Sequence, residues 1–160
     1  MVWVECGLGC AMGLKLLLLN GLSQIQSGLG AIDAELRIPM AIALGAIPGA
    51  LCRYYLTRWC IQWFGMGFPF GTFIINLSGA LVMGFFATFT MERAIASTEL
   101  RALVAIGFLG SYTTFSTYAL DTANLLHSGQ WVKSLTYWST SAVLGVICLE
   151  LGSAMARKIG

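Results

Sequence analysis

The feature that most limits how this chain can fold is a series of four long apolar segments with almost no charge inside them. Crossing the hydrocarbon core of a bilayer as a helix takes roughly 20 mainly apolar residues. The segments cover about residues 38–59, 68–91, 100–125 and 131–156. Only 10% of the chain is charged, whereas an ordinary soluble domain carries about 25% charged residues. The sequence therefore predicts an all-α, multi-pass membrane protein with four transmembrane helices.

The links between the apolar segments are too short to hold a soluble domain. They cover residues 62–67, 92–99 and 127–130. Short links make consecutive helices antiparallel neighbours, so we expect a four-helix membrane domain over residues 38–160. Residues 1–37 differ, because their apolar stretch is short and is interrupted by Lys15. Three interpretations of them stay open: a peripheral helix, a signal-like segment, or a dispensable extension that precedes a start at Met40.

Charge and cysteine content exclude several classes of function. The net charge is only +2 and the basic residues are scattered, so the chain has no stripe of cations that could follow a nucleic acid backbone. The five cysteines and the single histidine have no spacing typical of a metal site. No Ser/His/Asp set or pair of carboxylates is placed for hydrolysis. We therefore expect neither a nucleic-acid-binding protein nor an enzyme.

Lys and Arg specify the orientation of the helices only weakly. Without residues 1–39, one side of the membrane carries Arg93, Arg101, Arg157 and Lys158, and the other carries Arg58, Lys133 and, in part, Arg53. Cytoplasmic loops normally hold a clear excess of these residues. We hypothesise that the chain inserts in both orientations, which would permit an antiparallel dimer. A single fixed orientation in a tagged-terminus accessibility assay would contradict this hypothesis.

Small and polar residues in the first two segments indicate close helix contacts. Gly45 and Gly49 form a small-xxx-small pattern, which lets helix backbones approach closely and favours oligomerisation. Arg53 either extends its charge to the interface or faces the bundle, where it holds carbonyl groups or attracts anions near a pore mouth. Asn76 needs a partner, because an unpaired buried amide costs several kcal/mol. It either joins two helices or lines a pore as a donor.

The polar stretch 107–118 in the third segment is the strongest functional signal. Five Ser or Thr hydroxyls lie between Ser111 and Thr117. Ser and Thr are mediocre helix formers and Gly110 adds backbone freedom, so we expect a helix break at mid-membrane. Backbone released from helical hydrogen bonds must be buried in protein or line a watery cavity. Broken membrane helices typically coordinate ions at such a place.

The fourth segment extends this polar surface. Tyr137 and Ser141 are four residues apart and so share a helix face. No carboxylate lies in the middle of any segment, although a proton-coupled pump usually buries one. Neutral hydroxyl and amide donors, together with electropositive aromatic edges, can replace the water shell of a small anion. The residue types therefore favour an anion pathway over a proton relay.

In these motifs the sequence resembles the Fluc/CrcB family of fluoride ion channels. The resemblance covers about residues 38–156. It rests on a glycine-rich first helix with a late arginine at 45–54, on a Gly-Thr-x3-Asn signature at 71–76, and on the third-segment stretch 107–118. Asp121 stands where an acidic residue is usual in the family.

The resemblance implies a passive, fluoride-selective channel that lowers cytoplasmic fluoride. It implies an antiparallel dual-topology homodimer in the cell (inner or plasma) membrane, with two pores along the subunit interface. It further implies a structural sodium ion at the dimer centre, held by the backbone carbonyls of Gly110 and Thr113. Phe115 would be a pore aromatic whose edge meets fluoride. The remaining side chains implied to line the route are those of Asn76, Thr114, Ser116, Thr117, Tyr118, Tyr137 and Ser141, with Arg53 and Asp121 at the pore mouth or in structural roles.

Two positions depart from the family's pattern, and two other classes of protein compete with the channel. Tyr118 stands where a second pore phenylalanine is common, so selectivity or rate would differ. Gly145 replaces a hydroxyl at the next position of the polar face. A small dual-topology drug exporter relies on a carboxylate in its first helix, and residues 38–52 contain none. A non-transporting assembly subunit would need no track of hydroxyls.

Overall fold

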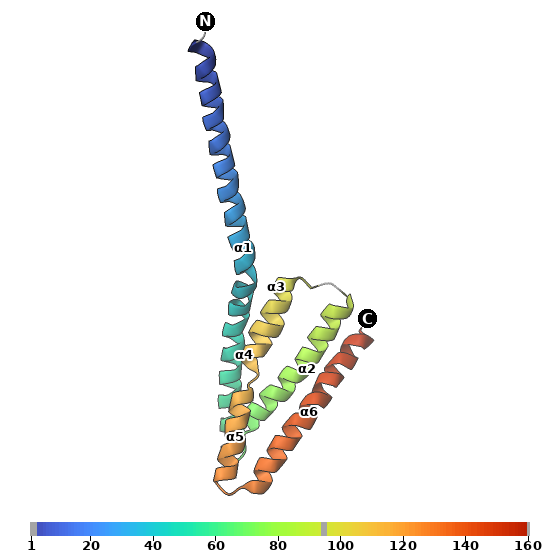
Figure 1. Ribbon diagram of the computed structural model, residues 1–160. Helices are drawn as coiled ribbons and strands as arrows, with labels where there is room; N and C mark the ends of the chain where they lie inside the picture. Colours follow the sequence, from blue (N-terminus) through green and yellow to red (C-terminus); the bar gives the residue numbers. More distant parts are fainter. Residues whose placement is uncertain (1–2, 94–95, 160) are drawn as a thin grey trace. The chain divides into compact units, whose positions relative to one another are not determined.

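The structure is a computed structural model, and every regular element that it describes is helical (Figure 1). It describes the backbone of residues 3–93 and 96–159 and, among these, the side chains of residues 20, 21, 33, 35–91 and 96–159. The elements in chain order are α1 (Trp3–Phe64), α2 (Phe70–Arg93), α3 (Thr98–Arg101), the π-helix η1 (Ala102–Leu109), α4 (Gly110–Tyr112), α5 (Phe115–His127) and α6 (Trp131–Lys158).

Four helical stretches are long and apolar enough to cross a membrane. They are Glu35–Phe64, Phe70–Met91, Thr98–His127 and Trp131–Lys158. Each agrees within a few residues with one of the apolar segments read from the sequence, so the all-α fold with four membrane-spanning helices is confirmed. The third stretch differs from the other three, because it is divided among α3, η1, α4 and α5.

The chain divides into two compact units, Met1–Arg37 and Ile38–Gly160. From Trp3 onward the backbone of the first unit is helical and belongs to α1. The role of this unit stays a prediction. All site residues predicted from the sequence lie in the second unit.

Within the second unit, α2 and α6 lie side by side (Figure 1). Glycines make their close contact possible. A Cβ atom on Gly84 would collide with the carbonyl oxygen of Leu149, and one on Gly152 would collide with that of Leu81. Ser153 Oγ also donates to the carbonyl of Gly84 at 3.3 Å. Small residues thus let the two backbones touch, which matters because lipid gives helices no hydrophobic drive to associate.

α1 approaches η1 in the same way. A Cβ atom on Gly45 would collide with the carbonyl oxygen of Leu103, and one on Gly49 would collide with that of Phe108. The close helix contact predicted from this glycine pair is therefore confirmed, while oligomerisation stays a prediction. The sequence did not predict the π-helical winding of η1, which is rare and often found at functional sites. η1 ends at Leu109.

Much of the apolar surface of the second unit is exposed. Ile75, Leu109 and Tyr137 have fully buried side chains. In contrast, large apolar side chains such as Leu44 and Val146 are more than half exposed. An apolar surface of this extent does not suit water, and it suits a protein surrounded by lipid or by another protein chain.

Candidate functional site

The helix of the third span is interrupted at Thr113 and Thr114. Both residues have extended backbone dihedral angles, with φ −79° and ψ 158° at Thr113 and φ −150° and ψ 114° at Thr114. α4 ends at Tyr112 before them, and α5 begins at Phe115 after them. The interruption therefore lies inside the polar stretch 107–118 that the sequence singles out.

Two backbone carbonyl groups at the interruption accept no hydrogen bond from any residue that the structure describes. In a continuous helix, the carbonyl of Gly110 would accept from Thr114 N–H and that of Thr113 from Thr117 N–H. Thr114 N–H donates instead to Asn76, and Thr117 N–H donates to the Thr114 side chain. No hydrogen bond within the described part of the chain ends on either carbonyl oxygen. Free carbonyls of unwound membrane helices are typical sodium ligands, so these residues fit the ion that the sequence resemblance implies.

Asn76 on α2 holds the interrupted backbone with both ends of its amide. Nδ2 donates to the carbonyl of Thr114 at 3.1 Å, and Oδ1 accepts from the N–H of Thr114 at 2.9 Å. These bonds satisfy two backbone groups that the interruption frees, in a region where an unpaired polar group is costly. The contacts therefore agree with the interpretation of Asn76 as a residue that joins two helices. A second N–H on Nδ2 remains available for another acceptor.

Thr114 also begins α5 as its N-cap residue. Its buried Oγ1 accepts from the N–H of Thr117 at 3.2 Å and lies 3.0 Å from Thr117 Oγ1 and 3.3 Å from Ser116 Oγ. A threonine at this position satisfies one of the N–H groups that a helix start leaves without a partner. Thr114 thus restarts the helix, while the side chains of Ser116 and Thr117 remain exposed.

An open cleft of about 640 Å³ borders the interruption, and we call it the break cleft. Its lining residues are Asn76, Gly79, Ala80, Met83, Leu109, Thr113, Thr114, Phe115, Tyr118, Trp138, Ser141, Ala142 and Leu149. Phe115 is 80% exposed. Ser141 Oγ is buried and has no hydrogen-bond partner among the described residues. An aromatic ring, a hydroxyl and an amide therefore border one space, and none of the lining residues is charged.

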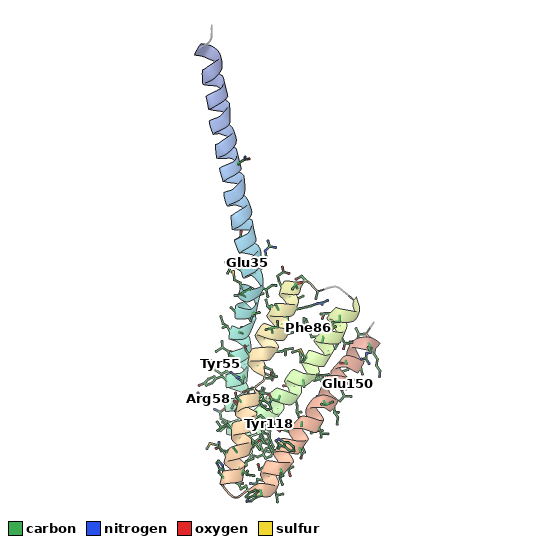
Figure 2. All side chains as sticks on the ribbon, viewed as in Figure 1. Glu35, Tyr55, Arg58, Phe86, Tyr118 and Glu150 are labelled. Atoms are coloured by element: carbon green, nitrogen blue, oxygen red, sulfur yellow. The ribbon has the colours of Figure 1, made fainter. Side chains whose placement is uncertain are left out.

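Tyr118 belongs to the break cleft, but its hydroxyl already has a partner. It donates to the carbonyl of Trp138 on α6 at 2.8 Å. The Tyr118 ring centroid lies 5.7 Å from that of Phe115 and 5.3 Å from that of Tyr137. Three aromatic rings thus follow one another where α5 meets α6, with Tyr118 in the middle; Figure 2 labels Tyr118. The extra hydroxyl of this tyrosine ties α5 to α6.

A second polar cluster joins α2, α5 and α6. Thr72 Oγ1 donates to Asp121 Oδ2 at 2.7 Å. Tyr137 on α6 is fully buried, and its hydroxyl has no hydrogen-bond partner among the described residues. Thr72 is not among the site residues predicted from the sequence. Its position four residues before Asn76, on the same face of the helix, is the signal that could have found it.

The remaining predicted residues lie elsewhere. A cleft of about 470 Å³, which we call the polar cleft, is lined in part by Thr72, Thr117 and Asp121. Ser116 lines neither the break cleft nor the polar cleft. The same is true of Arg53, which is half-buried on α1. The structure therefore brings predicted residues of α2, α5 and α6 together at the interruption and leaves Arg53 apart from them.

Comparison with known proteins identifies the family of this chain. Residues 40–153 match the model of a family described as "CrcB-like protein, Camphor Resistance (CrcB)". The chain belongs to the CrcB family. The family predicted from the sequence motifs is therefore confirmed, over nearly the whole second unit.

Several CrcB relatives are highly similar over almost their full length. The chain is 52% identical over 126 residues to the "Fluoride-specific ion channel FluC" of Synechococcus sp.. This alignment covers 79% of this chain and 97% of the relative. The proteins of the same name from Trichormus variabilis and Synechocystis sp. are 52% and 49% identical, and cover 78% and 80% of the chain and 92% and 98% of their own lengths. A family of ion channels is not an enzyme family, so the expectation that this multi-pass membrane protein is not an enzyme is confirmed.

Proposed function

We propose that this chain is a fluoride-specific ion channel that lowers cytoplasmic fluoride by passive export across the cell membrane. The observation that carries the proposal is the 52% identity over 97% of the length of a relative named for this activity. Fluoride is the anion of a weak acid, whose neutral form can cross a membrane and ionise inside. A passive exit for the anion then lowers its internal concentration.

The chemistry of the break cleft supports an anion as the conducted ion. Its lining has no charged residue and includes the hydroxyl of Ser141, the amide of Asn76 and the exposed ring of Phe115. The edge of an aromatic ring is electropositive. Neutral donors of this kind can replace the water around fluoride without holding it tightly, which conduction requires. A fixed cation in the same place would trap the anion.

The exposure of these residues supports an antiparallel homodimer with two pores at the subunit interface. Phe115 is 80% exposed in a single chain, and the break cleft is open. Backbone freed from helical bonds cannot face lipid, so a second protein surface must cover the interruption at mid-membrane. A second copy in the opposite orientation is consistent with the weak Lys and Arg bias of the flanking segments. Residues 1–37 are a separate extension in this proposal.

Gly110 and Thr113 would hold the structural sodium ion in this dimer. Two copies supply two carbonyl oxygens each, and these oxygens have no hydrogen-bond partner within the described part of one chain. The bound cation supplies positive charge that offsets the converging carbonyl dipoles. The remaining predicted residues, Thr114, Ser116, Thr117, Tyr118, Tyr137 and Asp121, would shape the route beside this centre, and Arg53 would attract anions at a pore mouth.

Ion efflux from liposomes that contain the purified protein tests the proposed function. Fluoride efflux without chloride efflux, and without coupling to protons, is the expected result. Phe115→Ile combined with Ser116→Ala should reduce fluoride flux, whereas Leu120→Ile on the exposed face of α5 should not. An absence of fluoride flux from correctly folded dimers would refute the channel. Unchanged flux in the Phe115 and Ser116 double variant would favour a protein whose hydroxyl track is not a pathway.

A further inference from the structure

A large apolar cleft lies outside the proposed pore and takes no part in the proposed conduction of fluoride. It measures about 860 Å³ and lies between α1, α2 and the stretch formed by η1 and α4. We call it the α1 cleft. Its walls are formed mainly by Tyr55, Leu56 and Trp59 on α1, Val82 on α2, and Phe108 and Leu109 on η1. Pockets that hold small molecules typically measure about 300–1,000 Å³, so the α1 cleft is large enough to hold a ligand.

The α2 and α4 walls of the α1 cleft offer few polar groups to a ligand. Ser78 Oγ donates to the carbonyl of Ile74 at 2.7 Å. Tyr112 OH lies 2.8 Å from Ser78 Oγ, so each hydroxyl has the other as a partner. The wall between this pair and α1 is apolar. An occupant of this part of the cleft is therefore apolar as well.

The α1 wall of the cleft carries one cation, Arg58. Arg58 is exposed and projects outward from α1 (Figure 2). Its Nη1 donates to Tyr54 OH at 3.2 Å, and its guanidinium carbon lies 5.8 Å from the centre of the Tyr54 ring. The charge of Arg58 interacts with the side chains of Tyr54 and Tyr55, and with no carboxylate among the described residues. The guanidinium thus keeps donors and a full charge for an anion from outside the chain.

The length and position of the α1 cleft match one leaflet of a bilayer. Its lining on α1 runs from Cys52 to Gln62, ten residues along the span Glu35–Phe64. At 1.5 Å per residue this is about 15 Å, which is half of the roughly 30 Å hydrocarbon core. Trp59, next to Arg58 in the chain, and Trp63 lie near the end of this span with ring centroids 5.8 Å apart, where tryptophans gather at the membrane interface.

We propose that the α1 cleft binds one anionic phospholipid, with an acyl chain along the apolar wall and the phosphate at Arg58. Such a lipid has both properties that the cleft requires: an apolar tail of one-leaflet length and an anionic head at the interface. A segment of a second copy would cover the apolar wall but would leave the Arg58 charge without a partner unless it also supplied a carboxylate there. The α1 cleft shares only Leu109 with the break cleft, and the proposed lipid site does not depend on fluoride conduction.

Quenching of tryptophan fluorescence by brominated lipid tests the proposal. Trp59 lines the α1 cleft, so the full chain is prepared with Trp59 as its single tryptophan by replacing the other four with phenylalanine. The protein is placed in phosphatidylcholine vesicles that contain the same fraction of either brominated phosphatidylglycerol or brominated phosphatidylcholine. We expect the apparent local concentration of the anionic lipid to exceed that of the neutral lipid roughly fivefold, the enrichment for one arginine at an anionic lipid surface.

Two variants separate a lipid site from general charge attraction. Arg58→Gln should remove the preference for phosphatidylglycerol, whereas Lys158→Gln, which deletes an exposed cation at the end of α6, should leave it intact. As a check that does not rely on the tryptophan replacements, native mass spectrometry of the wild-type protein should detect more retained phosphatidylglycerol than phosphatidylcholine.

Three results would overturn the proposal. The first is equal quenching of Trp59 by the two lipids in the wild-type background. The second is no quenching by either lipid while a single tryptophan at Trp131 is quenched, because the cleft is then covered by another protein chain. The third is displacement of phosphatidylglycerol by millimolar inorganic phosphate, because the site then recognises a free anion and not a lipid.

Discussion

Replacing Asn76 by leucine tests how the interrupted helix is held. Asn76→Leu keeps the size of the side chain but removes both hydrogen bonds to the Thr114 backbone, at 3.1 and 2.9 Å. In membrane proteins a hydrogen bond between helices contributes about 0.6 kcal/mol on average and about 1.7 kcal/mol at most. Two bonds therefore predict a loss of about 1–3 kcal/mol, which is roughly 5- to 150-fold in the unfolding equilibrium. The upper part of this range applies because Thr114 is 8% exposed, so water cannot easily replace the amide.

Two measurements check this prediction. Reversible unfolding in micelles or bilayers should give the loss in stability, and hydrogen exchange should become faster at the Thr114 amide by a similar factor. Ser139→Ala is the matched control, because it removes an exposed hydroxyl that donates within its own helix, to Leu135 at 2.8 Å. It should change stability by less than about 0.5 kcal/mol. If Asn76→Leu changes stability no more than this control and leaves the Thr114 amide protected from exchange, the two hydrogen bonds of Asn76 do not stabilise the interruption.

Three further predictions concern packing, Tyr118 and the cation. Gly152→Ala, which drives a methyl group into a carbonyl of α2, should destabilise the protein by about 1–3 kcal/mol in an unfolding assay, whereas Gly145→Ala, with open space around it, should not destabilise it. Tyr118→Phe removes the hydrogen bond to the carbonyl of Trp138. It should cost about 0.5–1.5 kcal/mol of stability and retain fluoride flux. A loss of flux would place the Tyr118 hydroxyl in the conduction path. Exchange of sodium for a large organic cation during purification should lower dimer stability and flux, and an unchanged dimer in light scattering would contradict the sodium site.

Sequence reasoning located the spans because composition alone decides them. Residues 68–91 contain no charge, and a stretch of that kind has no stable place outside lipid or a protein core. The pair Gly45 and Gly49 predicted a close contact because an absent side chain at helical spacing leaves a groove on any helix. Local composition also singled out the stretch 107–118, in which Thr113 and Thr114 have extended backbones.

Contacts between distant residues could not be read from the sequence. Asn76 and Thr114 are separated by 38 positions, and nothing local to Asn76 shows which backbone its amide meets. The hydrogen bond from Thr72 on α2 to Asp121 on α5 also joins residues 49 positions apart, and no local pattern predicts it. Likewise, the sequence does not show that the Tyr118 hydroxyl donates to Trp138, because the distance between α5 and α6 depends on how both pack against α2.

The way in which hydrogen bonds are distributed at the interruption connects the fold with the two proposed ion sites. Asn76 satisfies both backbone groups of Thr114, and the Thr114 hydroxyl satisfies one N–H of α5. The groups left over are carbonyl oxygens at the end of α4 and the first N–H groups of α5. A helix C-terminus attracts cations and a helix N-terminus attracts anions. In the proposed channel, one interruption would therefore offer adjacent positions of opposite polarity, for a cation between the carbonyls and for an anion near Phe115, and Asn76 would keep them apart by fixing Thr114 between them.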